Sequence, residues 1–176
     1  MKRHTLLYIY MVMCMGMMLT ACDDRTVYSH YESTPVKGWE RNDTLSFDVA
    51  PMQQTGQYVA EVGLRIAGSY PFKGVTLVVE QTVMPSNMKQ TYTLNCDLID
   101  DLGRIKGKGI NHYQYSFPLS TLKLNEGESL HVSIHHDMKR EILPGITDVG
   151  LKLSRQVATS VQTKENEKQE GETPQR

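Results

Sequence analysis

Residues 57–66 read QYVAEVGLRI, and apolar and polar side chains alternate along this stretch. One face of the alternation carries Glu61 and Arg65, and the opposite face is apolar. The apolar face consists of Tyr58, Ala60, Val62, Leu64 and Ile66. A period of two residues predicts a β-strand with one buried face.

The same alternation returns along the chain, between turn-rich pieces such as residues 85–87 and 125–127. Further strands are expected at residues 45–49, 75–80, 91–98, 113–119, 130–136 and 149–153. A helical apolar stripe is missing, although residues 118–124 and 137–143 could each form one helical turn. The pattern predicts an all-β fold, a single antiparallel β-sandwich of immunoglobulin-like type with about seven to eight strands.

The N-terminus has the order of a secretory signal, with Lys2 and Arg3 before an uncharged apolar run over residues 6–19. This run is about 14 residues long, shorter than the roughly 20 that cross a bilayer as a helix. It ends in Leu19-Thr20-Ala21-Cys22, the pattern of a bacterial lipobox. We expect a lipid on Cys22; an ordinary signal peptide or an uncleaved anchor explains the small residues before Cys22 less well.

The composition divides the chain into four parts. We expect a lipoprotein signal peptide at 1–21, a lipidated tether at 22–42 that docks onto the domain, and a β-sandwich at 43–154. After Ser154 the chain is rich in Gln, Glu, Lys and Thr, so 155–176 is expected to be a disordered tail.

The charge bears on nucleic-acid binding, and the cysteine content bears on disulfide formation. The 176-residue chain has a formal net charge of −1 with both signs interspersed, which gives no indication of nucleic-acid binding. Cys14 leaves with the signal and Cys22 takes the lipid, so Cys96 has no disulfide partner. Because Cys96 falls on the same face as Leu94, we expect a buried, inert thiol.

The best candidates for metal ligands are four residues in and next to one expected strand: His131, His135, His136 and Asp137. His112 is a possible fifth ligand. In a strand, His131 and His135 would lie about 13 Å apart, too far to bind one ion. Solvated histidines on the outer face are the better interpretation, and we expect no metal and no cofactor.

Other patterns also favour turns over active sites. Asp97, Asp100, Asp101 and Gly103 lack the donor spacing of a calcium loop, and the glycine-rich residues 103–109 lack the end of a nucleotide loop. We expect no enzyme; a remote alternative is a loop-built active site that uses His112, His131 or His135 as base. Asp43-Thr44-Leu45 resembles a bacterial O-glycan acceptor, which makes Thr44 a candidate modification site, and Asn42 lies in an Asn-x-Thr sequon.

Several stretches, in order from the lipobox to about Leu153, together resemble the gliding-motility lipoprotein GldH family. They are Tyr28, Tyr31 and Trp39, then Leu64-Arg65, Tyr70-Pro71-Phe72, Gly107-Lys108-Gly109, and Met138 with Leu143-Pro144-Gly145-Ile146 and Asp148-Val149-Gly150. Most of these residues are expected to be structural, whereas Arg65 and Arg140 could form a buried ion pair or contact a partner.

The resemblance implies a non-enzymatic accessory or assembly component of the gliding-motility and type IX secretion machinery. Its expected partners are membrane lipid, through acylated Cys22, and envelope proteins, and its expected location is the periplasmic side of the outer membrane. The alternative is a ligand- or glycan-binding envelope lipoprotein. An exposed row formed by Trp39, Tyr113 or Tyr115 would favour that alternative.

Overall fold

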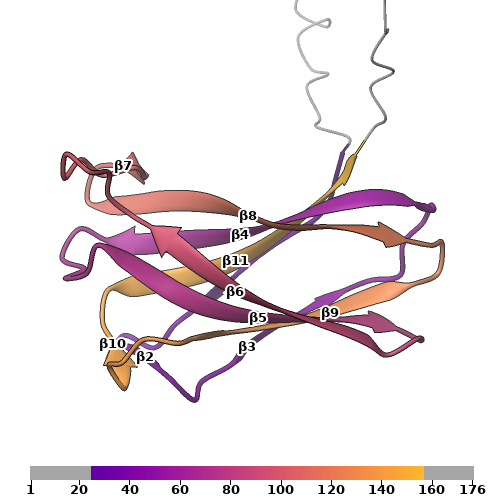
Figure 1. Ribbon diagram of the computed structural model, residues 1–176, viewed down its shortest axis with the longest axis horizontal. Helices are drawn as coiled ribbons and strands as arrows, with labels where there is room; N and C mark the ends of the chain where they lie inside the picture. The colour runs from indigo at the N-terminus through magenta and orange to yellow at the C-terminus, as the bar shows by residue number, and fades with distance from the viewer. Residues whose placement is uncertain (1–24, 157–176) are drawn as a thin grey trace, which may run out of the picture.

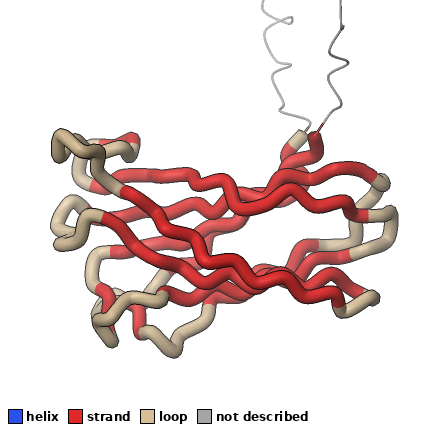
Figure 2. The backbone as a smooth tube through the Cα atoms, viewed as in Figure 1, coloured by secondary structure: helices blue, strands red, loops and turns tan. Residues whose placement is uncertain are grey.

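The computed structural model describes residues 25–156, which fold into strands joined by turns and loops, with no helix in this range (Figures 1 and 2). Eight strands have five residues or more, in agreement with the predicted number, and three have two residues. The strands are β1 (Thr26–Ser33), β2 (Trp39–Glu40), β3 (Leu45–Val49), β4 (Gly56–Ala67), β5 (Gly74–Met84), β6 (Met88–Asp97), β7 (Lys108–Gly109), β8 (His112–Leu124), β9 (Ser129–His136), β10 (Ile142–Leu143) and β11 (Ile146–Gln156).

Two antiparallel sheets form the sandwich, which confirms the predicted fold class. The five-stranded sheet has the order β1-β11-β4-β8-β7 and occupies the upper part of Figure 1. The four-stranded sheet has the order β3-β9-β5-β6 and lies below it, and β10 pairs with β2 at one end. Within residues 25–156 there is no helix that is long and apolar enough to cross a membrane.

The core lies between the sheets and comes from the alternating faces that the sequence predicts. In β4, the side chains of Tyr58, Ala60, Val62, Leu64 and Ile66 are at most 2% exposed. They face the buried side chains of the four-stranded sheet, Phe47, Val75, Leu77, Val79, Leu130, Val132 and Ile134. Burial of these apolar surfaces is the main favourable contribution to folding.

The structure differs from the predicted tether at residues 22–42. Residues 26–33 form β1, which pairs along its length with β11, and Trp39 is fully buried. The alternation in β1 is hard to recognise because the large side chain of Tyr31 lies on the outer face of the sheet, whereas polar His30 and Glu32 occupy the alternate positions. Pro35 and Gly38, which suggested an irregular segment, fall only in the connection between β1 and β2.

Two smaller expectations also need correction. Neither helical turn forms, because residues 118–124 continue β8 and residues 137–141 form an irregular connection, with a bend at 139–141, that leads into β10. Arg155 and Gln156 extend β11 and pair with Tyr58 and Gln57. The remainder of the expected tail, together with the signal peptide and Cys22, lies outside the described residues.

Candidate functional site

A tyrosine lies across two glycines on the outer face of the five-stranded sheet. Tyr31, Gly150 and Gly63 are direct neighbours on β1, β11 and β4. A Cβ atom on Gly150 would lie 2.6 Å from a ring carbon of Tyr31, and one on Gly63 would also overlap the ring. The two glycines are therefore required to leave room for the aromatic ring.

Arg65 and Gln114 complete this cluster, which we call the tyrosine platform (Tyr31, Gly63, Arg65, Gln114 and Gly150). The guanidinium carbon of Arg65 lies 4.1 Å from the centroid of the Tyr31 ring, a cation–π contact. The Gln114 amide donates a hydrogen bond of 3.3 Å to the Tyr31 hydroxyl oxygen. Arg65 stays exposed, so its charge is available on the surface.

Four of the five platform residues, all except Arg65, line a recess of about 240 Å³. Its rim is charged, since Lys152 Nζ lies 3.7 Å from a carboxylate oxygen of Glu61. Ser116 donates a hydrogen bond of 3.4 Å to the same carboxylate. The recess therefore combines an aromatic surface with hydrogen-bond donors and acceptors.

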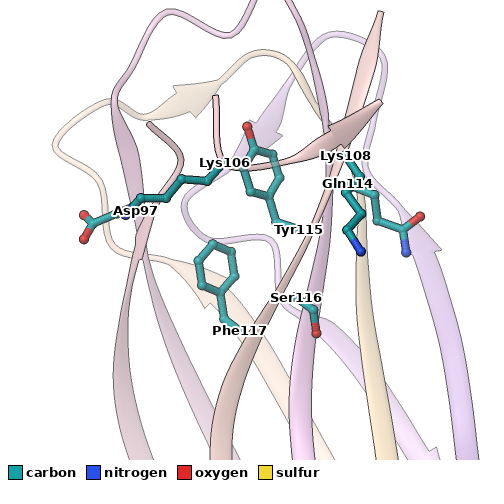
Figure 3. Close-up of a pocket in the computed structure, with 7 residues that line it drawn as sticks. All are labelled: Asp97, Lys106, Lys108, Gln114, Tyr115, Ser116 and Phe117. Atoms are coloured by element: carbon teal, nitrogen blue, oxygen red, sulfur yellow. The ribbon is translucent and has the colours of Figure 1, made fainter. Parts of the chain in front are cut away.

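A second hollow, the edge cleft, opens where β8 faces β6 and has a volume of about 550 Å³ (Figure 3). Tyr115 and Phe117 point into it with nearly parallel rings, 7° apart in plane and 6.1 Å between centroids. Asp97 and Lys106 lie on the opposite side of the cleft. Burial raises the pKa of the Tyr115 hydroxyl, against the opposing effect of a hydrogen bond with the Gly107 backbone.

The two hollows meet at β8. Gln114 and Ser116 line both of them, and Figure 3 shows these two side chains on the other side of the strand from Tyr115 and Phe117. Successive side chains of a strand point to opposite faces, so one short segment of β8 supplies both surfaces.

The predicted histidine cluster is divided between the two faces of β9. His131 lies on the outer face with Nδ1 2.6 Å from the Asp48 carboxylate, and His135 is partly exposed. His136 instead points inward and is fully buried, which corrects the expectation of solvated histidines for this residue. In residues 25–156 no three potential metal-ligating side chains of the His, Cys, Asp and Glu types cluster together.

The buried side chain of His136 contacts Trp39 and has a structural role. Its Nε2 donates a hydrogen bond of 3.0 Å to the backbone carbonyl of Trp39, and the two rings meet edge to face at 5.3 Å. Burial lowers the pKa of His136 below its ordinary value, although the bond to Trp39 acts in the opposite direction. The neutral imidazole is therefore the form that the fold favours.

The predicted turns and the inert cysteine agree with the structure. The Asp100 carboxylate accepts hydrogen bonds from the backbone N–H groups of Leu102 and Arg104, which closes a charged loop and lowers the pKa of Asp100. Cys96 is 1% exposed, and burial raises the pKa of its thiol to about 12. Such a thiol stays protonated at neutral pH and is a poor nucleophile.

The remaining candidate residues lie on the surface. Thr44 is exposed immediately before β3. Neither Arg65 nor Arg140 forms a buried ion pair; Arg140 is exposed and donates a hydrogen bond of 3.1 Å to the Ile142 carbonyl. The platform itself was missed at the sequence level, because its residues come from four strands.

The chain is similar to known proteins in sequence and, more weakly, in shape. It is 26% identical over 147 residues to the gliding motility lipoprotein GldH of Flavobacterium johnsoniae, covering 80% of this chain and 91% of the relative. Among solved structures, a family GH115 4-O-methyl-alpha-glucuronidase, BtGH115A, has 12% identity and a TM-score of 0.40, covering 77% of this chain and 18% of that one. A family 35 carbohydrate-binding module from Clostridium thermocellum has 11% identity and a TM-score of 0.36, covering 72% of this chain and 89% of that one.

These two structural similarities are too weak to support an argument about function. The sequence model of the GldH lipoprotein family matches residues 26–153, from the start of β1 nearly to the end of β11. The match includes the residues that form the tyrosine platform. This chain therefore belongs to the GldH lipoprotein family.

Proposed function

We propose that the protein is a non-enzymatic lipoprotein that serves as an accessory or assembly component of the gliding-motility and type IX secretion machinery. It would be held on the periplasmic side of the outer membrane by a lipid on Cys22. One observation supports this most: Tyr31, Arg65 and Gly150, three residues through which the chain resembles its family, converge on the outer face of the five-stranded sheet, where Arg65 is exposed.

The platform has the chemistry of a protein contact surface. Tyrosine and arginine are enriched at the energetically important positions of protein interfaces. Tyr31 is already held flat by the glycines and by Arg65, so little side-chain entropy would be lost on binding. The five N–H donors of arginine suit carboxylates and backbone carbonyls of a partner protein.

The proposed anchor would hold this surface near the membrane. Only residues 23–25 separate Cys22 from the first residue of β1, Thr26. Four extended peptide units span at most about 14 Å. A lipid on Cys22 would therefore place the sandwich itself, and not a long tether, at the membrane surface.

The test is a deletion strain complemented with the wild-type gene, with Arg65→Glu or with Cys22→Ala, scored for gliding and for secreted proteins. We expect the wild type to restore both functions and the two variants to fail, with Arg65→Glu still present at normal abundance in membranes. Arg140→Glu is the matched control, because Arg140 is equally exposed but lies outside the platform. Normal gliding and secretion in the deletion strain would refute the proposal.

The edge cleft supports a second candidate function, binding of a ligand such as a glycan. Phe117 offers a partly exposed ring beside the charged groups of Asp97 and Lys106. Against it, Trp39 and Tyr115 are buried and Tyr113 is partly buried, so these three do not form an exposed row. Calorimetric titration of glycan fragments against wild type and Phe117→Ala would decide; binding that Phe117→Ala abolishes would favour this function.

A further inference from the structure

β6 is the open edge of the four-stranded sheet. In the described chain it pairs on one side with β5, over its full ten residues and without a bulge, and on the other side with no strand. Figure 1 shows it as the outer strand of the lower sheet, in the foreground. An unpaired strand of this length presents a row of free N–H and C=O groups that can pair with another strand.

The other sheet edges are better protected. β8 is covered by β7 at one end, contains Pro118, and has a bulge in its pairing with β4 near Ala60. β1 has an irregular register near Thr26, and β3 has only five residues. Proline, bulges and short strands are three means by which an edge avoids pairing. β6 has none of these three, and its charged residues are Lys89 and Asp97 near its two ends.

We propose that β6 pairs antiparallel with β6 of a second copy of this chain, with Thr93 opposite Thr93 at the two-fold axis. The four-stranded sheets of the two copies would then join into one continuous sheet of eight strands. An interface of this kind is isologous, since the same residues contribute from both copies.

Charge selects this register. Residues that lie opposite each other in the two β6 strands must point to the same face of the joined sheet. The residue at the two-fold axis can therefore shift from Thr93 to Tyr92 or Leu94, but no register that places outward residues opposite inward ones is allowed. With Thr93 at the centre, Lys89 lies opposite Asp97 of the second copy, and this pair occurs twice by symmetry. With Tyr92 at the centre, Lys89 would face Asn95 instead, and with Leu94 at the centre it would lie beyond the end of the partner strand.

Two further pairs in this register are also complementary. On the outer face, Thr91 meets Asn95 of the second copy, and both side chains can donate and accept hydrogen bonds. On the inner face, half-buried Tyr92 meets half-buried Leu94 of the second copy. Apolar cross-strand pairs of this kind stabilise antiparallel sheets, and here they would extend the core across the axis.

The same symmetry suits two chains in one membrane. A two-fold axis between antiparallel strands is perpendicular to the sheet, so both copies keep the same face on the same side. Figure 1 shows β1 beginning at the top of the view, on the side of the five-stranded sheet away from β6. Both Cys22 residues could then reach one membrane; this step alone depends on the proposed lipid anchor.

The experiment is charge reversal in the mature lipoprotein in detergent, with the protein mass measured by sedimentation after correction for bound detergent. We expect a dimer for the wild type, at least a tenfold weaker dimer for Lys89→Glu and for Asp97→Lys, and recovery in the double variant. Lys89 also pairs with Glu80 at 2.9 Å, so thermal unfolding of each variant serves as the check on folding.

Disulfide trapping tests the register independently. Thr93→Cys should form an intermolecular disulfide on mild oxidation, because the two Cβ atoms face each other at the axis. Thr91→Cys is the matched control, since residue 91 of one copy would lie four positions from residue 91 of the other and should not cross-link. A monomeric wild type, no rescue in the double variant, or equal cross-linking of both cysteine variants would overturn the proposal, whereas gliding and secretion phenotypes bear only on the proposed function.

Discussion

At the scale of single residues, Tyr31 performs a task that its sequence position does not suggest. Gly63 and Gly150 leave a gap on the outer face of the five-stranded sheet, and the Tyr31 ring covers it. Arg65 then packs on the exposed side of the ring. Tyrosine, glycine and arginine side chains from different strands thus form one preorganised surface.

We expect Tyr31→Ala to lower the free energy of unfolding by about 1–2 kcal/mol, because it loses the ring packing and the cation–π contact. Tyr31→Phe should be nearly neutral, since only the long hydrogen bond to Gln114 is lost. Urea denaturation measures both. A double-mutant cycle with Arg65→Ala should give a coupling of about 0.5–1 kcal/mol; a coupling near zero would show that the contact contributes nothing.

His136 should make stability depend on pH. Its pKa in the folded protein is depressed below the ordinary value of 6.5, because burial disfavours the imidazolium. As the pH falls below 6.5, the unfolded chain takes up a proton that the folded chain resists. The free energy of unfolding should therefore decrease, by at most about 1.4 kcal/mol per pH unit.

The measurement is chemical denaturation of wild type and His136→Asn between pH 7.5 and 5. The variant should be less stable throughout but should lack this part of the pH dependence, while other titrating groups contribute equally to both proteins. Parallel pH profiles for the two proteins would contradict the role assigned to His136.

At the scale of elements, the β7–β8 hairpin depends on backbone that only glycine tolerates. Gly109 has φ of +148°, and a Cβ atom there would collide with the His112 carbonyl. Gly107 packs directly against the Tyr115 ring, with a hypothetical Cβ 2.6 Å from it. The Gly107-Lys108-Gly109 motif therefore packs beside Tyr115, and its Lys108 lines the edge cleft.

We expect Gly109→Ala to cost about 1–3 kcal/mol and to open this hairpin, because the residue combines backbone strain with a steric clash. Gly103→Ala is the matched control: Gly103 also has a positive φ, +78°, but nothing lies within 4 Å of its Cβ position. Hydrogen exchange of the amides in β7 and the start of β8 would report the opening. Equal effects of the two variants would show that the clash is unimportant.

At the scale of the whole molecule, β1 and β11 place the chain ends of the sandwich close together, since Thr26 pairs with Ser154. The N-terminal end of β1 is also the point nearest to Cys22 along the chain. The sandwich is therefore constructed so that its first strand is both an integral part of a sheet and the connection to the proposed anchor.

We expect Cys22→Ala to move the protein out of the membrane fraction without loosening the sandwich. The core residues of the described range lie between β1 and β11, so removing the lipid should leave the unfolding temperature of the sandwich unchanged. Carbonate extraction of membranes, followed by thermal unfolding of the recovered protein, measures both. Continued membrane association of the variant would mean that another part of the chain binds the membrane.

The sequence by itself determined most of the strands, because the alternation that buries one face of β4, β5 or β9 is a local pattern. It also determined the family, whose motif residues can be recognised in order along the chain. Only the tertiary structure decided that β1 belongs to the sheet, that His136 points inward, and that Tyr31 meets Arg65 and Gly150. These features depend on which strands pair and in what register, and such contacts join residues far apart in the chain, so no local pattern reports them.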